Sequence, residues 1–351
     1  MADFIRILAI DGGGIRGIVP GQILVKLEQL LQDKTKNPQV RIADYFDLIA
    51  GTSTGGILTC LYLYPDLPDN PQRPCFSAQD AVDFYLKHGP DIFRRSFWHL
   101  VLSLFGLVKA KYPAKYFEGC LKGFFGATKL SQLVKPCLIT SYNIEKRYAH
   151  FFTKHDAEQY SDYDFFLTDV ARATAAAPTY FKPAGIRSVE EVFYPLIDGA
   201  VFANNPTLCA YSEVYRTFQN SPTARDMVIL SLGTGEDEKP ISYKKADNWG
   251  VLQWAVPIIK ILMSGSPENV DYQLQTIFES MDCSGQYLRI DPYLPDELTE
   301  LDDVSETNMR ALVNLGKATA TEYLPELSHF ADLLLADSKA KMQGTVQKKS
   351  V

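Results

Sequence analysis

The 351-residue sequence lacks several features that would place it in a simple functional class. Its six cysteines are scattered and no two form a C-x-x-C pair, which argues against a zinc site of ordinary ligand spacing. Positive charge is not in excess either, because 35 Lys and Arg stand against 42 Asp and Glu, a net charge of −7. That balance disfavours a general nucleic-acid-binding protein. We therefore expect no metal, no other cofactor and no nucleic-acid partner.

Long hydrophobic segments are also missing. The chain does not begin with the basic start, apolar core and small-residue cleavage site of a signal peptide. Residues 48–65 carry no charge, but GTSTGG at their centre is too polar for a membrane-spanning helix. With 46% apolar and 22% charged residues, we expect a soluble, cytoplasmic protein that can associate peripherally with a membrane. The last 15 residues hold four lysines, so we expect a domain at 1–335 and a flexible basic tail at 336–351.

Short apolar segments alternate with segments of helical spacing along most of the chain. We predict strands at 4–10, 45–50, 136–143, 148–153, 192–197, 227–232 and 286–290. We predict helices after Pro20, from about 54 to 63, and at 166–176, 206–218, 268–281 and 304–323, with a proline-rich loop at 65–76. Such alternation is typical of an α/β fold whose largely parallel sheet has helices on both faces.

A G-x-S-x-G pattern, GTSTG, lies at 51–55 between a predicted strand and a predicted helix. In a nucleophile elbow, glycines such as Gly51 and Gly55 permit the sharp turn that exposes a serine, here Ser53. The serine also stands at a helix N-terminus, where free N–H groups favour a developing anion. A polar helix cap would produce the same letters, but the strand-turn-helix context favours a nucleophile.

A nucleophilic serine needs a base. Of the five histidines, only His329 follows Asp198 in the chain, as a Ser-Asp-His order would require, and no motif surrounds it. Asp198 comes just after a predicted strand, where open α/β sheets place their ligands. Asp198, Gly199 and Ala200 would by themselves suggest only a turn. We nevertheless predict that Asp198 takes the serine proton directly.

The glycine-rich loop GGGIRG at 12–17 also follows a predicted strand. It fits G-x-G-x-x-G from Gly12 to Gly17, which leaves a dinucleotide-binding loop as an alternative. Against that alternative, the second predicted strand ends in GTS and not in the acidic residue that would hold a ribose. The other interpretation is an oxyanion hole, in which the N–H groups of Gly12, Gly13 and Gly14 converge on one point. Arg16 would add positive charge or brace the loop.

Taken in order, DGGGIRG at 11–17, GTSTG at 51–55 and DGA at 198–200 resemble the hallmarks of the patatin-like phospholipase family. Residues 43–47, 88–90, 175–181, 230–235 and the region of Met309 are also similar to patatin segments. The resemblance covers about residues 4–335 and is strongest to the plant-type branch. It implies a three-layer α/β/α fold with a mainly parallel central sheet.

The same resemblance implies a chemistry. Ser53 would attack an ester carbonyl, Asp198 would act as general base, and the loop with Gly12, Gly13, Gly14 and Arg16 would hold the oxyanion. Members of the family are lipid acyl hydrolases that act on phospholipids and galactolipids, usually without a metal. The missing leader departs from plant patatins and argues against a vacuolar storage role. A storage or interaction protein that keeps the fold, and a nucleotide-binding protein, remain as alternatives.

Two apolar runs remain. Residues 87–135 carry nine Lys and Arg and two acids, a charge of +7, against −14 for the rest of the chain. Within them, the apolar run 97–108 has basic flanks, which suits the surface of an anionic membrane. One hypothesis is that this run is a lid or docking surface that brings lipid to Ser53, with Trp98, Leu100, Leu104 and Phe105 as candidate contacts. The alternative is a buried helix with solvated ends, and both stay open. We interpret the second run, 251–263, as a core helix.

Overall fold

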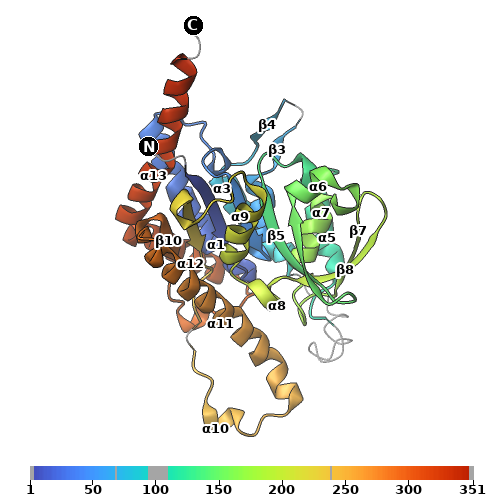
Figure 1. Cartoon of the computed structure of the whole chain (residues 1–351). Helices are drawn as coiled ribbons and strands as arrows, with labels where there is room; N and C mark the ends of the chain where they lie inside the picture. The colour runs from blue at the N-terminus through green and yellow to red at the C-terminus, as the bar shows by residue number, and fades with distance from the viewer. Residues whose placement is uncertain (1–3, 68, 94–109, 238, 348–351) are drawn as a thin grey trace.

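A central sheet of eight strands organises the chain (Figure 1). The computed structural model describes residues 4–67, 69–93, 110–237 and 239–347. The strand order is β10-β9-β1-β2-β5-β8-β7, and β6 pairs with β5. The strands are β1 (Ile5–Ile10), β2 (Leu48–Thr52), β5 (Cys137–Asn143), β6 (Tyr148–Thr153), β7 (Ala184–Arg187), β8 (Phe193–Asp198), β9 (Met227–Leu232) and β10 (Tyr287–Ile290).

The sheet is parallel from β10 to β5 and antiparallel beyond it. β1 and β9 are almost entirely buried, as their mainly apolar sequences, interrupted by Arg6 and Ser231, predict for strands covered on both faces. Successive side chains of a strand point to opposite faces, and the two sides of β1 accordingly join different hydrophobic clusters. Leu8 and Ile10 face one cluster, whereas Ile7 and Ala9 face the other.

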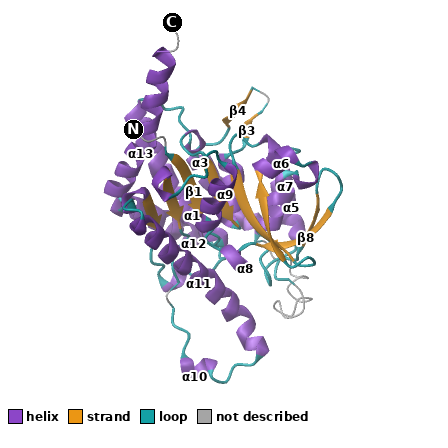
Figure 2. Ribbon diagram, viewed as in Figure 1, coloured by secondary structure: helices purple, strands orange, loops and turns teal. Residues whose placement is uncertain are grey.

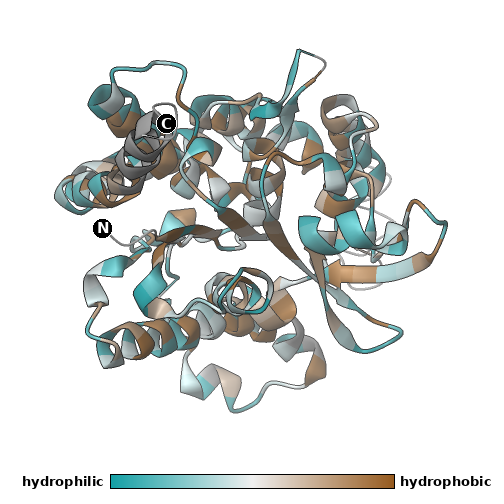
Figure 3. Cartoon of the chain, turned by 45° about the horizontal axis from the view of Figure 1, so that its top comes forward, coloured by the Kyte–Doolittle hydropathy of each residue, from teal (hydrophilic) through white to brown (hydrophobic). Residues whose placement is uncertain are grey.

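Helices cover both faces, so the fold has three α/β/α layers, as predicted (Figure 2). One face packs against α1 (Ile18–Thr35), α2 (Thr54–Tyr62), α3 (Ala78–Ile92), α5 (Ala114–Phe125), α7 (Leu167–Thr174), α12 (Glu306–Glu322) and α13 (Leu324–Gln347). The other packs against α9 (Thr207–Thr217) and the second half of α11 (Val251–Ser280). Three shorter helices are α6 (Lys154–Gln159), α8 (Ala200–Ala203) and α10 (Tyr243–Ala246). Figure 3 shows apolar central strands between these layers.

The predicted strands are all present, but two other predictions need correction. The proline-rich segment 65–76 is not only a loop, because β3 (Pro65–Asp66) and β4 (Asn70–Pro74) pair there as an antiparallel hairpin. The predicted core helix at 251–263 is the first half of α11, and it lies largely in solvent. Val251 is 88% exposed and Ile258 44%. The second half carries the buried Leu274 and Phe278, so the helix enters the core only there.

Other predictions concern residues about which less can be said. Trp98, Leu100, Leu104 and Phe105, the candidate membrane contacts, lie outside the described residues, so that hypothesis stays a prediction. α13 runs without interruption across residue 335 to Gln347, and the division into a domain and a tail also stays a prediction. Within the described ranges, no helix combines the length and the apolar character needed to cross a bilayer. All six cysteines are free.

The contact between α1 and α12 leads to a test of the packing. Gly316 is buried in α12, and a methyl group there would lie 2.7 Å from Cβ of Gln22 and 2.9 Å from the carbonyl oxygen of Val19. We expect Gly316→Ala to lower the free energy of unfolding by about 1 to 3 kcal/mol in urea titrations, because the backbone of α1 must move. Gly119→Ala in α5 is the control, since nothing lies within 4 Å of its added methyl. That change should stabilise the protein by about 0.5 to 1 kcal/mol; equal effects of both would contradict the packing.

Candidate active site

Ser53 occupies a strained turn between β2 and α2. Its φ of 54° and ψ of −116° lie outside the regions that side chains prefer, and its side chain is largely buried. The Ser53 N–H donates to Thr174 Oγ1 at 2.9 Å, and the Thr174 hydroxyl donates to the Thr140 carbonyl at 2.7 Å. Tyr85 fixes the first turn of α2, because its hydroxyl donates to the Thr54 carbonyl at 2.9 Å. These bonds hold the strained residue in place.

The glycines around Ser53 are required by close contacts. A methyl group on Gly55 would lie 2.0 Å from the carbonyl oxygen of Ile10, and one on Gly51 would lie 2.1 Å from the carbonyl oxygen of Gly55. No side chain fits at either position without moving the backbone. The pattern at 51–55 therefore brings the start of α2 directly against the end of β1.

Asp198 reaches Ser53 through the register of the sheet. β5 pairs with β2 at Thr140 and Thr52, and one residue further along it pairs with β8 at Ser141 and Asp198. β8 runs antiparallel to β5, so its last residue arrives at the level where β2 ends. The sequence predicted a strand end beside the serine, but not that this strand runs in the opposite direction.

The Asp198 carboxylate is completely buried between neutral donors. The Ser53 hydroxyl hydrogen-bonds to it, and the Ala200 N–H donates to Oδ1 at 2.8 Å. Burial raises the pKa of Asp198 to about 7, and these two bonds oppose the rise. Gly199 lies so close to Thr140 that a methyl group would be 2.1 Å from Oγ1. The three residues of the DGA motif thus contribute in different ways. Asp198 supplies the buried carboxylate, Gly199 permits the close contact with Thr140, and the Ala200 N–H donates to the carboxylate.

The glycine loop lies beside the same point. A methyl group on Gly12 would be 3.3 Å from Cβ of Ser53. Its N–H, however, donates to the Asn204 carbonyl at 3.1 Å, so of the three expected oxyanion donors Gly12 is already committed. Gly13 and Gly14 stand at the start of the 3-10 helix Gly14–Gly17, where N–H groups have no partner within the helix. These two amides are the better candidates for an oxyanion.

Arg16 braces the loop instead of facing the serine. Its side chain is buried, its Nε donates to the Gly13 carbonyl at 3.4 Å, and it lines a polar hollow next to the pocket that holds Ser53. Of the two expected roles, bracing fits this position. Asp11 and Asp291 also line this hollow. The buried Arg289 donates to Asp11 in two bonds of 3.0 and 2.7 Å and also pairs with Asp291. Burial raises the pKa of Asp11, and the ion pair with Arg289 opposes that rise.

An apolar pocket opens in front of Ser53. Gly14, Ser53 and Asp198 form its polar end. The remaining walls are almost wholly apolar and include Ile57, Ile92, Phe93, Phe117, Phe181, Val201, Leu262, Met263 and Leu301. An acyl chain is the ligand that such a surface suits, with its ester at the polar end.

Histidine does not complete this site within the described part of the chain. His88, His150, His155 and His329 are described, and none of them lines the pocket. His150 is buried among aromatic rings, where burial lowers its pKa to about 4. The arrangement is consistent with a dyad of Ser53 and Asp198.

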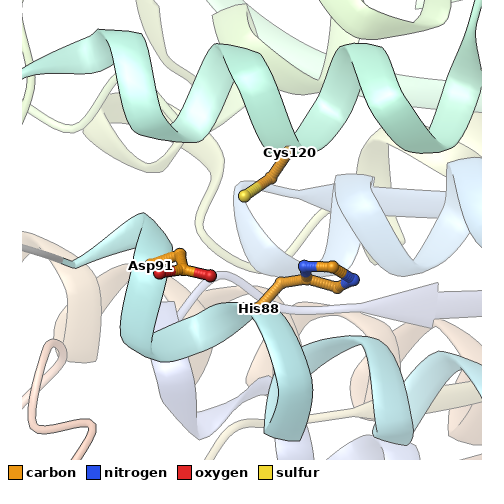
Figure 4. Close-up of side chains that lie close together, drawn as sticks. All are labelled: His88, Asp91 and Cys120. Carbon is orange, nitrogen blue, oxygen red and sulfur yellow. The ribbon is translucent and has the colours of Figure 1, made fainter.

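A separate cluster on the surface has the chemistry of metal ligands (Figure 4). One atom each of His88, Asp91 and Cys120 lies within 4.8 Å of the others, in a hollow that shares no lining residue with the Ser53 pocket. Burial lowers the pKa of His88, which favours the neutral, ligating imidazole. Lys87 and Lys115 line the same hollow and oppose a cation. The expectation that the protein needs no metal stays a prediction.

Several residues that support the site had no signal in the sequence. Each of them is far along the chain from the residue it holds. Thr174 is 121 residues from Ser53. Asn204 is 192 residues from Gly12, and Arg289 is 278 residues from Asp11. Single threonine, asparagine and arginine side chains form no motif. The one hint is that Thr174 immediately precedes the patatin-like segment at 175–181.

Comparison with known proteins gives a consistent result. A sequence model described as patatin-like phospholipase matches residues 8–211. Patatin-17 of Solanum cardiophyllum is 36% identical, and the alignment covers 95% of this chain and 90% of that protein. A Solanum tuberosum protein named probable inactive patatin-3-Kuras 1 is 35% identical, over 94% of this chain and 90% of its own. Human GIVD cytosolic phospholipase A2 superimposes with a TM-score of 0.43 and 12% identity, and the match covers 95% of this chain and 61% of that protein.

The buried carboxyl leads to a prediction about stability. We expect Asp198→Asn, which keeps the acceptor for the Ala200 N–H, to stabilise the folded protein by about 1 kcal/mol or more at pH 8. An unfolded aspartate ionises near pH 4, whereas the folded one does so near 7. Between these values ionisation favours the unfolded chain, so the wild type loses stability as the pH rises and the variant does not. Urea unfolding at pH 4.5, 6 and 8 measures this; a difference that is independent of pH would contradict it.

Proposed function

The chain belongs to the patatin-like phospholipase family, and on that premise we propose that it is an active serine lipid acyl hydrolase. Its substrates would be the fatty acyl esters of glycerophospholipids, a phospholipase A-type reaction, and also galactolipids. The observation that carries this proposal is the buried Asp198 carboxylate beside the strained Ser53 at the polar end of an apolar pocket. The six free cysteines suit the reducing cytoplasm, where we place the enzyme as a peripheral membrane protein.

The reaction follows from these positions. Ser53 Oγ attacks the ester carbonyl while Asp198 accepts the hydroxyl proton, a task for which a pKa of about 7 suits it better than the ordinary value near 4. The oxyanion that forms is stabilised by the N–H groups of Gly13 and Gly14, each worth about 3 kcal/mol. Asp198 then returns the proton to the departing glycerol oxygen. Water, activated by the same carboxylate, hydrolyses the acyl-enzyme and frees the fatty acid and Ser53.

The two adjoining hollows divide the substrate between them. Met263 and Leu301 form a wall common to the apolar pocket and to the polar hollow that holds Arg16. An acyl chain would enter the first, and the glycerol and its headgroup would face the second. Carboxylates, an amide and hydroxyls line the polar hollow, which can bind the hydroxyls of a sugar headgroup. This supports galactolipids as further substrates.

Membership of the family does not by itself establish catalysis, because one similar protein is named probable inactive. Here Ser53, Asp198 and the glycine loop are all present, and Gly14, Ser53 and Asp198 line one pocket, which supports an active enzyme. A storage protein that has no use for catalysis would not need Asp198 buried against Ser53. We therefore propose an active enzyme in preference to a storage or nucleotide-binding protein.

Covalent labelling tests the nucleophile. We expect a fluorophosphonate probe to label the wild-type protein and to leave Ser53→Ala unlabelled. Hydrolysis of phosphatidylcholine should fall about 10³-fold or more in that variant, with fatty acid and lysolipid counted by mass spectrometry. Ser212→Ala is the matched control, since Ser212 is an exposed serine of α9 and should behave as wild type. A folded wild-type protein that neither reacts with the probe nor hydrolyses any ester would falsify the proposal.

The pH dependence tests the base. We expect kcat/KM for a short-chain, water-soluble ester to rise about tenfold per pH unit below 7 and to level off above it, because only ionised Asp198 accepts a proton. A soluble ester keeps the measurement independent of any membrane. A rate that is constant from pH 5 to 8 would show that Asp198 is not the titrating base.

A further inference from the structure

We propose that the first half of α11, residues 251–263, together with Trp249, is the surface by which this protein docks on a lipid bilayer. Acyl chains would pass along this surface to the pocket at Ser53. The inference rests on the proposed function, since it takes the substrate to be a membrane lipid. It replaces the core helix that the sequence suggested for the same residues. For brevity we call residues 249–263 the docking arm.

The docking arm carries a stripe of large apolar side chains that the protein leaves in water. Val251, Trp254, Ile258 and Ile261 follow one another at intervals of three, four and three residues, which places them on one face of the helix. They are 88%, 36%, 44% and 39% exposed, and the adjacent Leu262 is 44% exposed. Figure 1 shows this half of α11 and α10 extending away from the sheet at the bottom of the view. Contiguous apolar surface of this kind indicates a binding partner.

The arm is continuous with the interior and fixed to the catalytic loop. The helix runs on without a break into its buried half at Leu274 and Phe278. At the junction, Asn204 Nδ2 donates to the Met263 carbonyl at 2.9 Å, and the Asn204 carbonyl receives the Gly12 N–H. The exposed stripe is therefore held at a set position relative to Ser53.

Continuity with the pocket argues that the partner is lipid. Leu262, which adjoins the stripe and is exposed, also lines the pocket that contains Ser53. The neighbouring Met263 lines that pocket too. Each methylene group of an acyl chain lowers the equilibrium constant for transfer of the chain from lipid into water by a factor of about four. An acyl chain of more than ten carbons cannot cross water at a useful rate. A stripe embedded in the bilayer would give it an apolar path to the pocket.

The residues around the stripe suit a membrane interface. Two of the three tryptophans of the chain, Trp249 and Trp254, lie here with ring centroids 5.1 Å apart, and tryptophan concentrates at the boundary between lipid and water. Residues 240–263 contain three lysines and one aspartate, a charge of +2 in a chain of −7. That charge favours anionic headgroups. The arm is too short to span a bilayer, so it would lie in the interface.

Vesicle binding tests the docking arm. The variant Ile258→Asp with Ile261→Asp places charges on the stripe without touching the residues that line the pocket. The matched control is Tyr215→Asp with Tyr272→Asp, which changes two residues that are 51% and 70% exposed elsewhere on α9 and α11. Both proteins and the wild type are mixed with vesicles of phosphatidylcholine and phosphatidylserine at 7:3, and the bound fraction is measured by flotation. Thermal unfolding verifies that each variant folds.

We expect the stripe variant to bind these vesicles about tenfold or more weakly than the wild type and to hydrolyse vesicle lipid correspondingly more slowly. Hydrolysis of the soluble short-chain ester should stay within about twofold, and the control should behave as wild type. Equal vesicle binding by the wild type and a folded stripe variant would overturn the docking arm. So would sedimentation showing a wild-type dimer that the stripe variant dissociates, because the stripe would then be a contact between two copies.

The outcome separates this inference from the proposed function. If the wild type hydrolyses no ester in solution, the enzymatic proposal fails, while vesicle binding still reports on the arm. If the wild type hydrolyses the soluble ester but binds vesicles no better than the stripe variant, only the docking arm fails.

Discussion

The site depends on one close approach of main chain to main chain. The first turn of α2 lies against the end of β1 so tightly that Gly55 has no room for even a methyl group beside the Ile10 carbonyl. Together with the pairing of Ile10 and Gly51 in the sheet, this contact brings the loop after β1 and the turn after β2 to a common point. Ser53 and the amides of Gly13 and Gly14 follow different strands, and a side chain between them would separate the proposed nucleophile from the proposed oxyanion donors. The glycines are thus part of the geometry of the site.

Two buried aspartates near this point have different partners. Asp11 receives two bonds from Arg289, so a cation balances its charge within the fold. Asp198 receives only neutral donors from Ser53 and Ala200. Burial raises the pKa of both carboxyls to about 7, so the pKa alone does not distinguish them. What distinguishes Asp198 is its place beside Ser53 in the apolar pocket, which Asp11 does not line.

Much of this could be predicted from the sequence because the signals were local. The turn at Ser53, the loop at Gly12 and the strand ending at Asp198 each occupy a few consecutive residues with a recognisable pattern. The features that the sequence did not predict depend on contacts between distant parts of the chain. The direction of β8 and the contact of Asn204 with Gly12 have no local sequence pattern. The apolar run at 251–263 suggested a core helix, but its composition does not say whether protein covers it. The hairpin at 65–74 was missed because four prolines are typical of a loop.

The place of β1 in the sheet has a consequence for the protein during its synthesis. β1 is made first, yet it pairs on one side with β2 and on the other with β9, where Leu8 lies opposite Leu230. The glycine loop that follows β1 is held by Asn204, and the proposed base is Asp198. A ribosome must therefore release the chain beyond Asn204, more than half of its 351 residues, before Ser53, Asp198 and the glycine loop can meet. A nascent or truncated chain that stops before β8 therefore carries the Ser53 motif without the carboxylate that lies beside it.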